Sequence, residues 1–141
     1  MRILIDTNVV LDVLLKREPF YKVAVEVMEL TKLNNVQEYV SASAITDIYY
    51  LAYRQLKNKE LAGRLLKKLL TIVSVAGVSE REIKEALELE WSDFEDSVQY
   101  SVAFWQGMDA IITRNLNDYK KSEIPVWQPE QALKEISMSR H

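Results

Sequence analysis

Aspartates that follow predicted strands are the residues of this chain with the clearest chemical potential. Asp6 comes directly after the first predicted strand, and Asp47 lies one turn into the helix after the second. Asp96 lies in the first turn of the helix that follows the third strand, and Asp118 lies in the loop that leaves the fourth. Carboxylate oxygens are the ligands that hard divalent cations prefer. The four positions therefore predict a catalytic cluster of acids that holds such a cation.

The clustering follows from the sheet that the sequence predicts. In a parallel α/β sheet the carboxyl ends of the strands meet at one edge, and ligand sites form there. Carboxylates brought together at that edge repel one another and raise each other's pKa. Most of these acids have no Arg or Lys beside them in the sequence, so a divalent cation is the obvious agent of neutralisation. Asn8, Asp93 and Asn115 are the supporting candidates at the same edge.

Each aspartate also has an interpretation that involves no chemistry. Asp6 could serve only as the cap of the first helix, and Asp96 could only complement a helix N-terminus. Asp118 lies in a polar loop, where an acid is unremarkable. Asp47 is the hardest to explain in this way, because it interrupts the apolar segment AITDIYYL, and an unpartnered carboxylate in a dry interior is strongly unfavourable.

Scarce residue types exclude several other chemistries. The only histidine is His141 and there is no cysteine, so a two-histidine ribonuclease, a Ser-His-Asp hydrolase and a zinc site of histidines or thiolates are not expected. The three glycines form neither a G-x-G-x-x-G motif nor a P-loop. Catalysis would rest on carboxylates, Lys, Tyr, Ser or Thr, and carboxylates acting with a metal are the first expectation.

The elements that must position these residues alternate between strand and helix. Apolar and β-branched runs predict strands at 2–5, 36–42, 71–76, 109–113 and 124–129. Helical spacing and caps predict helices up to 16 and at 20–33, 43–56, 59–70, 79–90 and 91–107, with a last helix from Pro129. This order predicts an α/β fold, a mainly parallel central sheet flanked by helices. We expect one domain, 1–136, followed by a disordered tail, 137–141.

Three further expectations concern individual segments. Thr7 or Asn8 is expected to cap the first helix, and Ser79 with Glu82 is expected to form a capping box. The segment 43–56 is apolar almost all round, which predicts a helix buried on most sides.

Composition places the chain among globular proteins of ordinary size. It has 141 residues, 48% of them hydrophobic and 28% charged, with a formal net charge of −3. No apolar run reaches the length of a membrane span, and the N-terminus does not resemble a signal peptide. A cytoplasmic location and no membrane partner are therefore expected. The one basic run, 54–68, is either a solvated helix face or a surface that holds a nucleic-acid backbone.

Several segments together resemble the PIN-domain family. They are ILIDTNVVLD, SAITDIYYL, DFEDSVQYSVA, DAIITRNLNDY and IPVWQPEQAL, in the order and spacing that the family shows over nearly the whole chain. PIN domains are metal-dependent ribonucleases, and stand-alone prokaryotic members of this size are often VapC-type toxins of toxin–antitoxin pairs. The resemblance implies a PIN-like nuclease domain and an endoribonuclease that hydrolyses RNA phosphodiester bonds.

The resemblance also assigns roles to residues. Asp6, Asp47, Asp96 and Asp118 match the four family acids, and Asn115 is a polar helper. Asp6, Asp96 and Asp118 would bind Mg²⁺ or Mn²⁺, and the products would carry a 3′-hydroxyl and a 5′-phosphate. The chain departs from the family at Asp47, where glutamate is usual. The implied partners are the RNA substrate, a second copy in a homodimer and an antitoxin protein.

Other readings remain open beside this one. A catalytically weak PIN-like module that binds RNA or a partner protein is the main alternative. A phosphatase of the haloacid-dehalogenase type would need Asp-x-Asp, but Asn8 occupies the third position. A phosphoacceptor receiver domain would need an acidic pair at the first strand exit and a lysine after the last strand, and neither is evident.

Overall fold

The computed structural model describes residues 1–33 and 35–139. Within these residues the sheet is built from β1 (Arg2–Ile5), β2 (Gln37–Ser41), β3 (Ser74–Ala76), β4 (Ala110–Ile112) and β5 (Val126–Trp127). The α-helices are α1 (Thr7–Leu14), α2 (Tyr21–Glu29), α3 (Ala42–Leu56), α4 (Lys59–Leu69), α5 (Glu80–Leu89), α6 (Phe94–Trp105) and α7 (Pro129–Ser139). Two short 3₁₀ helices, η1 (Leu30–Lys32) and η2 (Leu116–Tyr119), complete the described elements.

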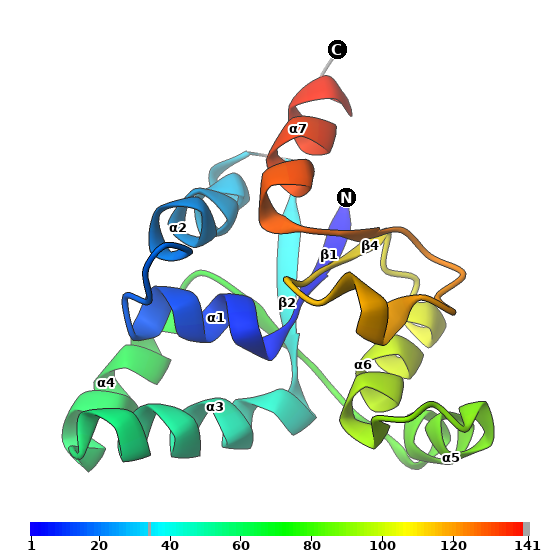
Figure 1. The fold of residues 1–141 in the computed structure, drawn as a ribbon, viewed down its shortest axis with the longest axis horizontal. Helices are drawn as coiled ribbons and strands as arrows, with labels where there is room; N and C mark the ends of the chain where they lie inside the picture. Colours follow the sequence, from blue (N-terminus) through cyan, green and yellow to red (C-terminus); the bar gives the residue numbers. More distant parts are fainter. Residues whose placement is uncertain (34, 140–141) are drawn as a thin grey trace.

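The strands form one parallel sheet in the order β3-β2-β1-β4-β5. The predicted α/β architecture is therefore confirmed. Figure 1 shows α3 and α4 extending to one side of the sheet and α5 and α6 to the other. The order of the strands reverses at β1, because the chain first adds β2 and β3 on one side and later adds β4 and β5 on the other. Crevices at the carboxyl ends of strands next to such a reversal are the usual ligand sites of α/β sheets.

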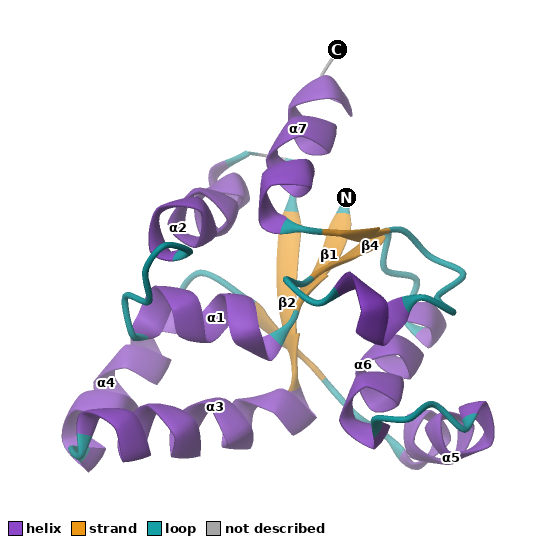
Figure 2. Cartoon of the chain, in the orientation of Figure 1, coloured by secondary structure: helices purple, strands orange, loops and turns teal. Residues whose placement is uncertain are grey.

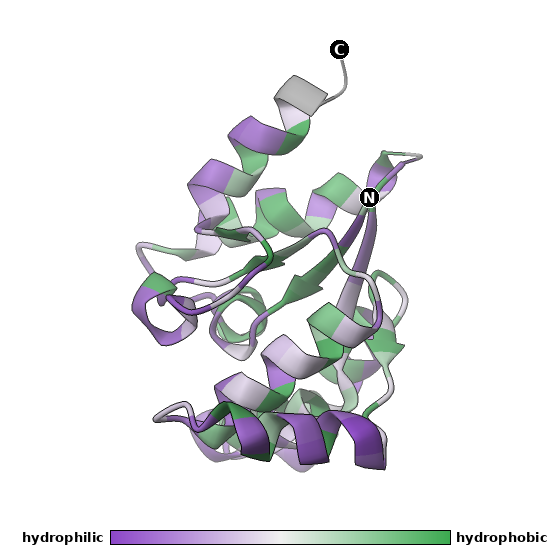
Figure 3. Ribbon diagram, turned by 90° about the vertical axis from the view of Figure 1, so that its right-hand side faces the viewer, coloured by the Kyte–Doolittle hydropathy of each residue, from purple (hydrophilic) through white to green (hydrophobic). Residues whose placement is uncertain are grey.

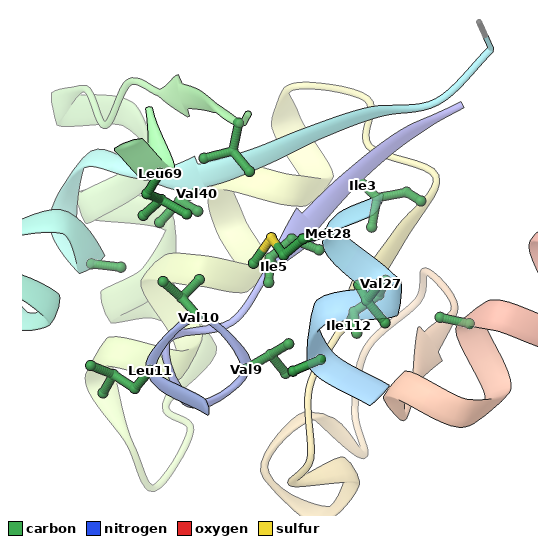
Figure 4. Packing of buried hydrophobic residues seen from close by; sticks show 14 of the residues in the cluster. Ile3, Ile5, Val9, Val10, Leu11, Val27, Met28, Val40, Leu69 and Ile112 are labelled. Atoms are coloured by element: carbon green, nitrogen blue, oxygen red, sulfur yellow. The ribbon is translucent and has the colours of Figure 1, made fainter. Parts of the chain in front are cut away.

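Alternation along β1 divides the core between the two faces of the sheet. Ile3 and Ile5 are fully buried on one face, in a cluster with Val9 and Val10 of α1 and with residues of α2 (Figure 4). Leu4 points to the opposite face, into a second cluster that includes residues of α5 and α6. Figure 2 shows the strands enclosed by helices, and in Figure 3 the strands at the centre are largely hydrophobic. A strand covered on both faces reads as a continuous apolar run.

Three expectations about individual elements need revision. The third strand covers only Ser74–Ala76, because the backbone N–H groups of residues 71–73 donate back to carbonyls at the end of α4. Helix α3 was expected to be buried on most sides, which is wrong, since Tyr50 is 61% and Leu51 is 41% exposed. Its buried residues are Ala44, Ile48 and Ala52, a single stripe with a spacing of four. Asp6, and not Thr7 or Asn8, caps α1.

Two other predictions concern the start of α5 and the end of α7, and both can be compared with the structure. The capping box of Ser79 and Glu82 is present at the start of α5. Helix α7 continues to Ser139, beyond residue 136. Residues 140 and 141 lie outside the described part of the chain, as does Asn34, which together with Asn35 is a turn signal in the sequence. No helix among the described residues has the length and apolar character needed to cross a membrane.

Candidate active site

The acids predicted from the sequence line one cleft at the carboxyl ends of β1 and β4. The cleft has a volume of about 380 Å³ and lies where the strand order reverses. All seven sequence-predicted residues contribute to its wall: Asp6, Asn8, Asp47, Asp93, Asp96, Asn115 and Asp118. They come from β1 and α1, α3, α6 and the segment after β4. The fold therefore brings together residues that are up to 112 positions apart in the sequence.

Asp6 is placed by the pairing of β1 with β4. Ile5 lies opposite Ile112 in the parallel register, and the Asp6 N–H donates to the Ile112 carbonyl at 2.9 Å. The side chain is buried, with an exposed fraction of 6%. Its Oδ1 accepts from the Thr7 N–H at 2.7 Å, which makes Asp6 the cap of α1 as well as a wall of the cleft.

Neutral donors complete the surroundings of Asp6. Gln99 of α6 donates from Nε2 to Asp6 Oδ1 at 2.7 Å, and Thr113 donates from Oγ1 to Oδ2 at 2.8 Å. Ser41 at the end of β2 donates to Gln99 Oε1 at 2.9 Å, which fixes the orientation of the amide. No ion pair within the described ranges involves Asp6. Burial raises the pKa of Asp6, and the hydrogen bonds from Thr113, Thr7 and Tyr119 oppose the rise only in part.

Asp96 lies beside Asp6 in the first turn of α6. Asp93 caps this helix, and its Oδ1 accepts from the Asp96 N–H at 3.1 Å. The buried Tyr119 hydroxyl approaches Asp96 Oδ1 at 3.4 Å, and it also interacts with Asp6. Burial, followed by the charges of Asp6, Asp93 and Asp118, raises the pKa of Asp96 to about 7. The predicted mutual repulsion of the acids is therefore present in the cleft.

Two further acids flank this pair. Asp47 is partly buried on α3 and shares a hydrogen bond with the exposed Glu95, which the sequence did not single out. That hydrogen bond, then desolvation and the charges of neighbouring aspartates, raises the pKa of Glu95 to about 7. Asp118 and Asn115 are exposed in the segment after β4, where the Asp118 N–H donates to the Asn115 carbonyl at 3.1 Å.

A pair of arginines stands on the α1 side of the same cleft. Arg17 and Arg114 both line it and both form ion pairs with Asp12, which is fully buried. Asn8 connects this group to the acids, because its Nδ2 donates to Thr113 Oγ1 at 3.3 Å and its Oδ1 accepts from the Arg114 N–H at 3.3 Å. The cleft therefore has an acidic side and a cationic side that are joined by the hydrogen bonds of Asn8.

The chemistry of the acids fits a hard divalent cation. Asp6, Asp96 and Asp118 offer only carboxylate oxygens as ligands. No ion pair among the described residues involves Asp6 or Asp96, and the pKa of each is raised. In residues 1–33 and 35–139, no three such side chains stand close enough to enclose a metal by themselves. Mg²⁺ is commonly held by one or two carboxylates while it keeps several of its waters. The donor set thus suits a metal bound partly through water.

Sequence reasoning missed the residues that surround the acids. Gln99 is the neighbour of Asp6 across 93 positions of sequence, and Thr113 and Tyr119 approach from the segment that also carries Asp118. Thr113 had a usable signal, because it is a polar residue directly after the buried strand AII. Gln99 had a weaker signal: it is a polar amide within the mainly apolar part of α6.

Comparisons with known proteins place the chain in a family. The family model described as the PIN domain matches residues 2–117. Ribonuclease VapC1 of Aquifex aeolicus (strain VF5) is 25% identical over 123 residues, which cover 84% of each chain.

Solved structures of low sequence identity share the fold. The structure of VapBC-1 from nontypeable Haemophilus influenzae matches with a TM-score of 0.73 at 18% identity, covering 92% of this chain and 99% of the other. The structure of VapBC2 from Rickettsia felis, bound to a DNA fragment of its promoter, matches with a TM-score of 0.70 at 18% identity, covering 91% and 98%. With the family model extending over most of its length, the chain belongs to the PIN domain family.

Proposed function

We propose that this protein is a metal-dependent endoribonuclease that hydrolyses RNA phosphodiester bonds and serves as the toxin of a toxin–antitoxin pair. The observation that carries the proposal is a buried carboxylate, Asp6, which has no cationic partner among the described residues and faces a second, repelled carboxylate, Asp96. Membership of the PIN domain family and similarity to a VapC ribonuclease support the same activity.

Asp6 and Asp96 would hold the cation, Mg²⁺ or Mn²⁺, with Asp118 completing the shell directly or through water. When bound, the cation lowers the pKa of a water for attack on phosphorus and stabilises charge on the phosphate oxygens. Asp47 is one methylene shorter than the glutamate usual in the family and would orient a water instead of binding the cation itself. The expected products carry a 3′-hydroxyl and a 5′-phosphate.

The chain's own residues hold this geometry in place. Gln99 and the Thr7 N–H fix Oδ1 of Asp6, while Thr113 fixes Oδ2, so the carboxylate cannot rotate away from the cleft. The Tyr119 hydroxyl contacts both Asp6 and Asp96 and donates to Asp96 Oδ1, which would ease the repulsion between the two carboxylates. Such fixed donors lower the reorganisation that binding and catalysis require.

An antitoxin protein is the proposed partner, and a homodimer is the proposed assembly. Solved structures with this fold include VapBC complexes. A mainly apolar cleft of about 560 Å³ lies between α1, α2 and α4 and is bordered by Lys16, Lys32 and Lys68, which suits an apolar segment with acidic flanks. Tyr50 and Leu51 on the exposed face of α3 provide apolar surface for a second copy.

Cleavage of single-stranded RNA with Mn²⁺ or Mg²⁺, and with EDTA as the metal-free control, tests the proposal. We expect cleavage that requires the metal, with 5′-phosphate ends, and we expect Asp96→Asn to abolish it while the melting temperature in EDTA stays equal or rises. Activity that survives in EDTA, or in a folded Asp96→Asn variant, would place the chemistry elsewhere.

A catalytically weak module that binds RNA or a partner protein is the second candidate. The observation that favours it is Asp47, which replaces the longer glutamate and is engaged by Glu95. Asp47→Glu separates the two functions. A nuclease should keep or gain activity when the usual reach is restored, whereas a binding module should remain inactive in both forms.

A further inference from the structure

The group formed by Asp12, Arg17 and Arg114 has more positive than negative charge. Arg17 Nε lies 2.8 Å from Asp12 Oδ1, and Arg114 Nε lies 2.7 Å from Oδ2. A second Arg114 nitrogen, Nη2, lies 3.3 Å from Oδ1. One carboxylate therefore accepts from two guanidinium groups, and a full positive charge remains on a wall of the cleft. A buried aspartate needs only one such partner for neutralisation, so the second arginine requires another explanation.

The two guanidinium groups are held in fixed positions. Arg17 Nη2 donates to the Asn8 carbonyl at 3.1 Å. The guanidinium carbon of Arg114 lies 3.8 Å from the centre of the Phe20 ring. The Arg17 and Arg114 side chains nevertheless remain 38% and 26% exposed, respectively, so both can reach a ligand in the cleft. Donors that are already ordered lose little conformational entropy when they bind.

The acidic side of the cleft makes a cationic site necessary for a nucleic-acid substrate. An RNA strand that brings a phosphate to Asp6, Asp96 and Asp118 is repelled by their charges, and the formal net charge of the whole chain is −3. Affinity for a phosphate backbone rests on local basic groups. Arg17 and Arg114 are the basic residues that line the same cleft as these acids.

We propose that Arg17 and Arg114 together bind a backbone phosphate of the RNA strand next to the one that is cleaved. The inference rests on the proposed function and adds a substrate-positioning site to it. A guanidinium donates in a planar fork that matches two phosphate oxygens, which a lysine cannot reproduce. Asp12 orients the two forks, and Asn8 ties their position to that of Thr113 and hence to Asp6.

Binding of a fluorescein-labelled single-stranded RNA of randomised sequence, measured in EDTA at several salt concentrations, tests this site without cleavage. We expect Arg17→Gln and Arg114→Gln each to weaken binding about tenfold, as for loss of one charge-assisted hydrogen bond. Each should also reduce the slope of log K against log salt by about 0.7, the value for one phosphate contact on a single strand. Arg17→Lys should keep most of the slope, because the charge remains.

Arg81→Gln is the matched control. Arg81 also stacks on an aromatic ring, 3.7 Å from the centre of Trp105, but it does not line the cleft. We expect this variant to bind RNA as the wild type does, and all variants are compared by melting temperature so that unfolding is recognised. If Arg17→Gln and Arg114→Gln lower only the melting temperature and leave affinity and salt slope at the Arg81→Gln values, the arginines merely neutralise Asp12 and the inference is wrong.

The result also separates this inference from the proposed function. If the wild type cleaves and binds RNA, and both arginine variants bind RNA as tightly as the wild type, only the phosphate site is overturned. A wild type that neither binds nor cleaves RNA overturns both. A wild type that binds RNA through the arginines but does not cleave it with either metal supports the site and overturns the nuclease.

Discussion

Asp6 and Asp12 are two buried aspartates only six positions apart, and the fold treats them in opposite ways. Asp12 is fully buried and faces two guanidinium groups. Asp6 is nearly as buried, yet its partners are neutral: a backbone N–H, an amide and two hydroxyl groups. Both arginines near α1 pair with Asp12 and neither pairs with Asp6. A different cation could therefore bind Asp6. Among the described residues no cation pairs with Asp6, which is the difference that we expect between the proposed chemical site and the structural one.

Glu38 shows a third way to bury an acid. It lies on β2 with an exposed fraction of 2%, and neither of its carboxylate oxygens has a hydrogen-bond partner within the described part of the chain. Burial raises its pKa to about 8, so it carries a proton at neutral pH. The charge of Asp12 is balanced by cations and that of Glu38 by a proton, whereas Asp6 is contacted by neutral donors, as the proposed metal site requires. The predictions below compare these three solutions.

The largest effect is expected at Asp6. Asp6→Asn keeps the shape of the side chain but removes the charge that would bind the cation, and it replaces one accepting oxygen with a donating NH₂ group. We expect RNA cleavage to fall about a thousandfold, roughly 4 kcal/mol of transition-state stabilisation, while the chain stays folded because the repulsion of Asp96 is relieved. Single-turnover cleavage assays and thermal unfolding measure the two effects, and a variant that loses stability while it retains activity would reverse the assignment of Asp6 and Asp12.

The second effect concerns metal binding. Mn²⁺ at about a hundred times its dissociation constant should stabilise the native protein by about 2.7 kcal/mol, since only the folded chain assembles the acids. Asp6→Asn should abolish this gain, and Asp12→Asn should retain it. Thermal unfolding across a Mn²⁺ titration provides the measurement, and an unchanged melting temperature of the wild type at saturation would contradict the proposed metal site.

The third effect separates Asp12 from Asp6 by stability. Asp12→Asn leaves two guanidinium groups facing each other without a carboxylate, so we expect a loss of about 2 kcal/mol. This is less than the roughly 3–5 kcal/mol for a broken, fully buried pair, because both arginines reach water. Urea unfolding with an unchanged m-value is the measurement. A neutral result would show that the arginines are held by something other than Asp12.

The smallest effect comes from Glu38. Burial raises its folded-state pKa from the ordinary glutamate value of 4.5 to about 8, so the folded protein binds more protons than the unfolded chain between these values. Stability is therefore fully present at low pH and is lost as the pH rises through about 8. Between pH 7 and pH 9 this loss amounts to about 1.4 kcal/mol.

Glu38→Gln removes the titrating group and provides the test. Its stability should show no such fall between these pH values, and comparison of urea unfolding at the two pH values in both proteins isolates the contribution of Glu38. A parallel decline in wild type and variant would assign the pH dependence to other groups.

The positions of the acids were predictable from the sequence because strand ends are local signals. Asp6 and Asp118 each follow a segment whose apolar pattern marks a buried strand, and parallel sheets bring such ends together. The arginines were not predictable in this way. Arg17 and Arg114 are 97 positions apart, and nothing in either segment indicates that both approach Asp12, whose burial itself depends on the packing of α1 against the sheet.

The limits of the fold prediction have a similar cause. The five strands and their parallel arrangement follow from the order of apolar segments. The exposure of α3 does not follow from the sequence, because the apolar residues of this helix point in all directions. Which of its faces is covered depends on the elements that pack against it in the folded structure. Exposed Tyr50 and Leu51 are thus visible only in the assembled structure, and they are the residues that a second copy would cover.

The register of β1 with β4 has an evolutionary consequence. Asp6 and Thr113 face each other because Ile5 lies opposite Ile112, and side chains alternate between the faces of a sheet with every residue. A single-residue insertion or deletion in either strand would therefore exchange the side chains that face the two hydrophobic clusters and move one member of the pair away from the other. Homologous chains should therefore keep the same spacing from each of these two strands to its polar residue.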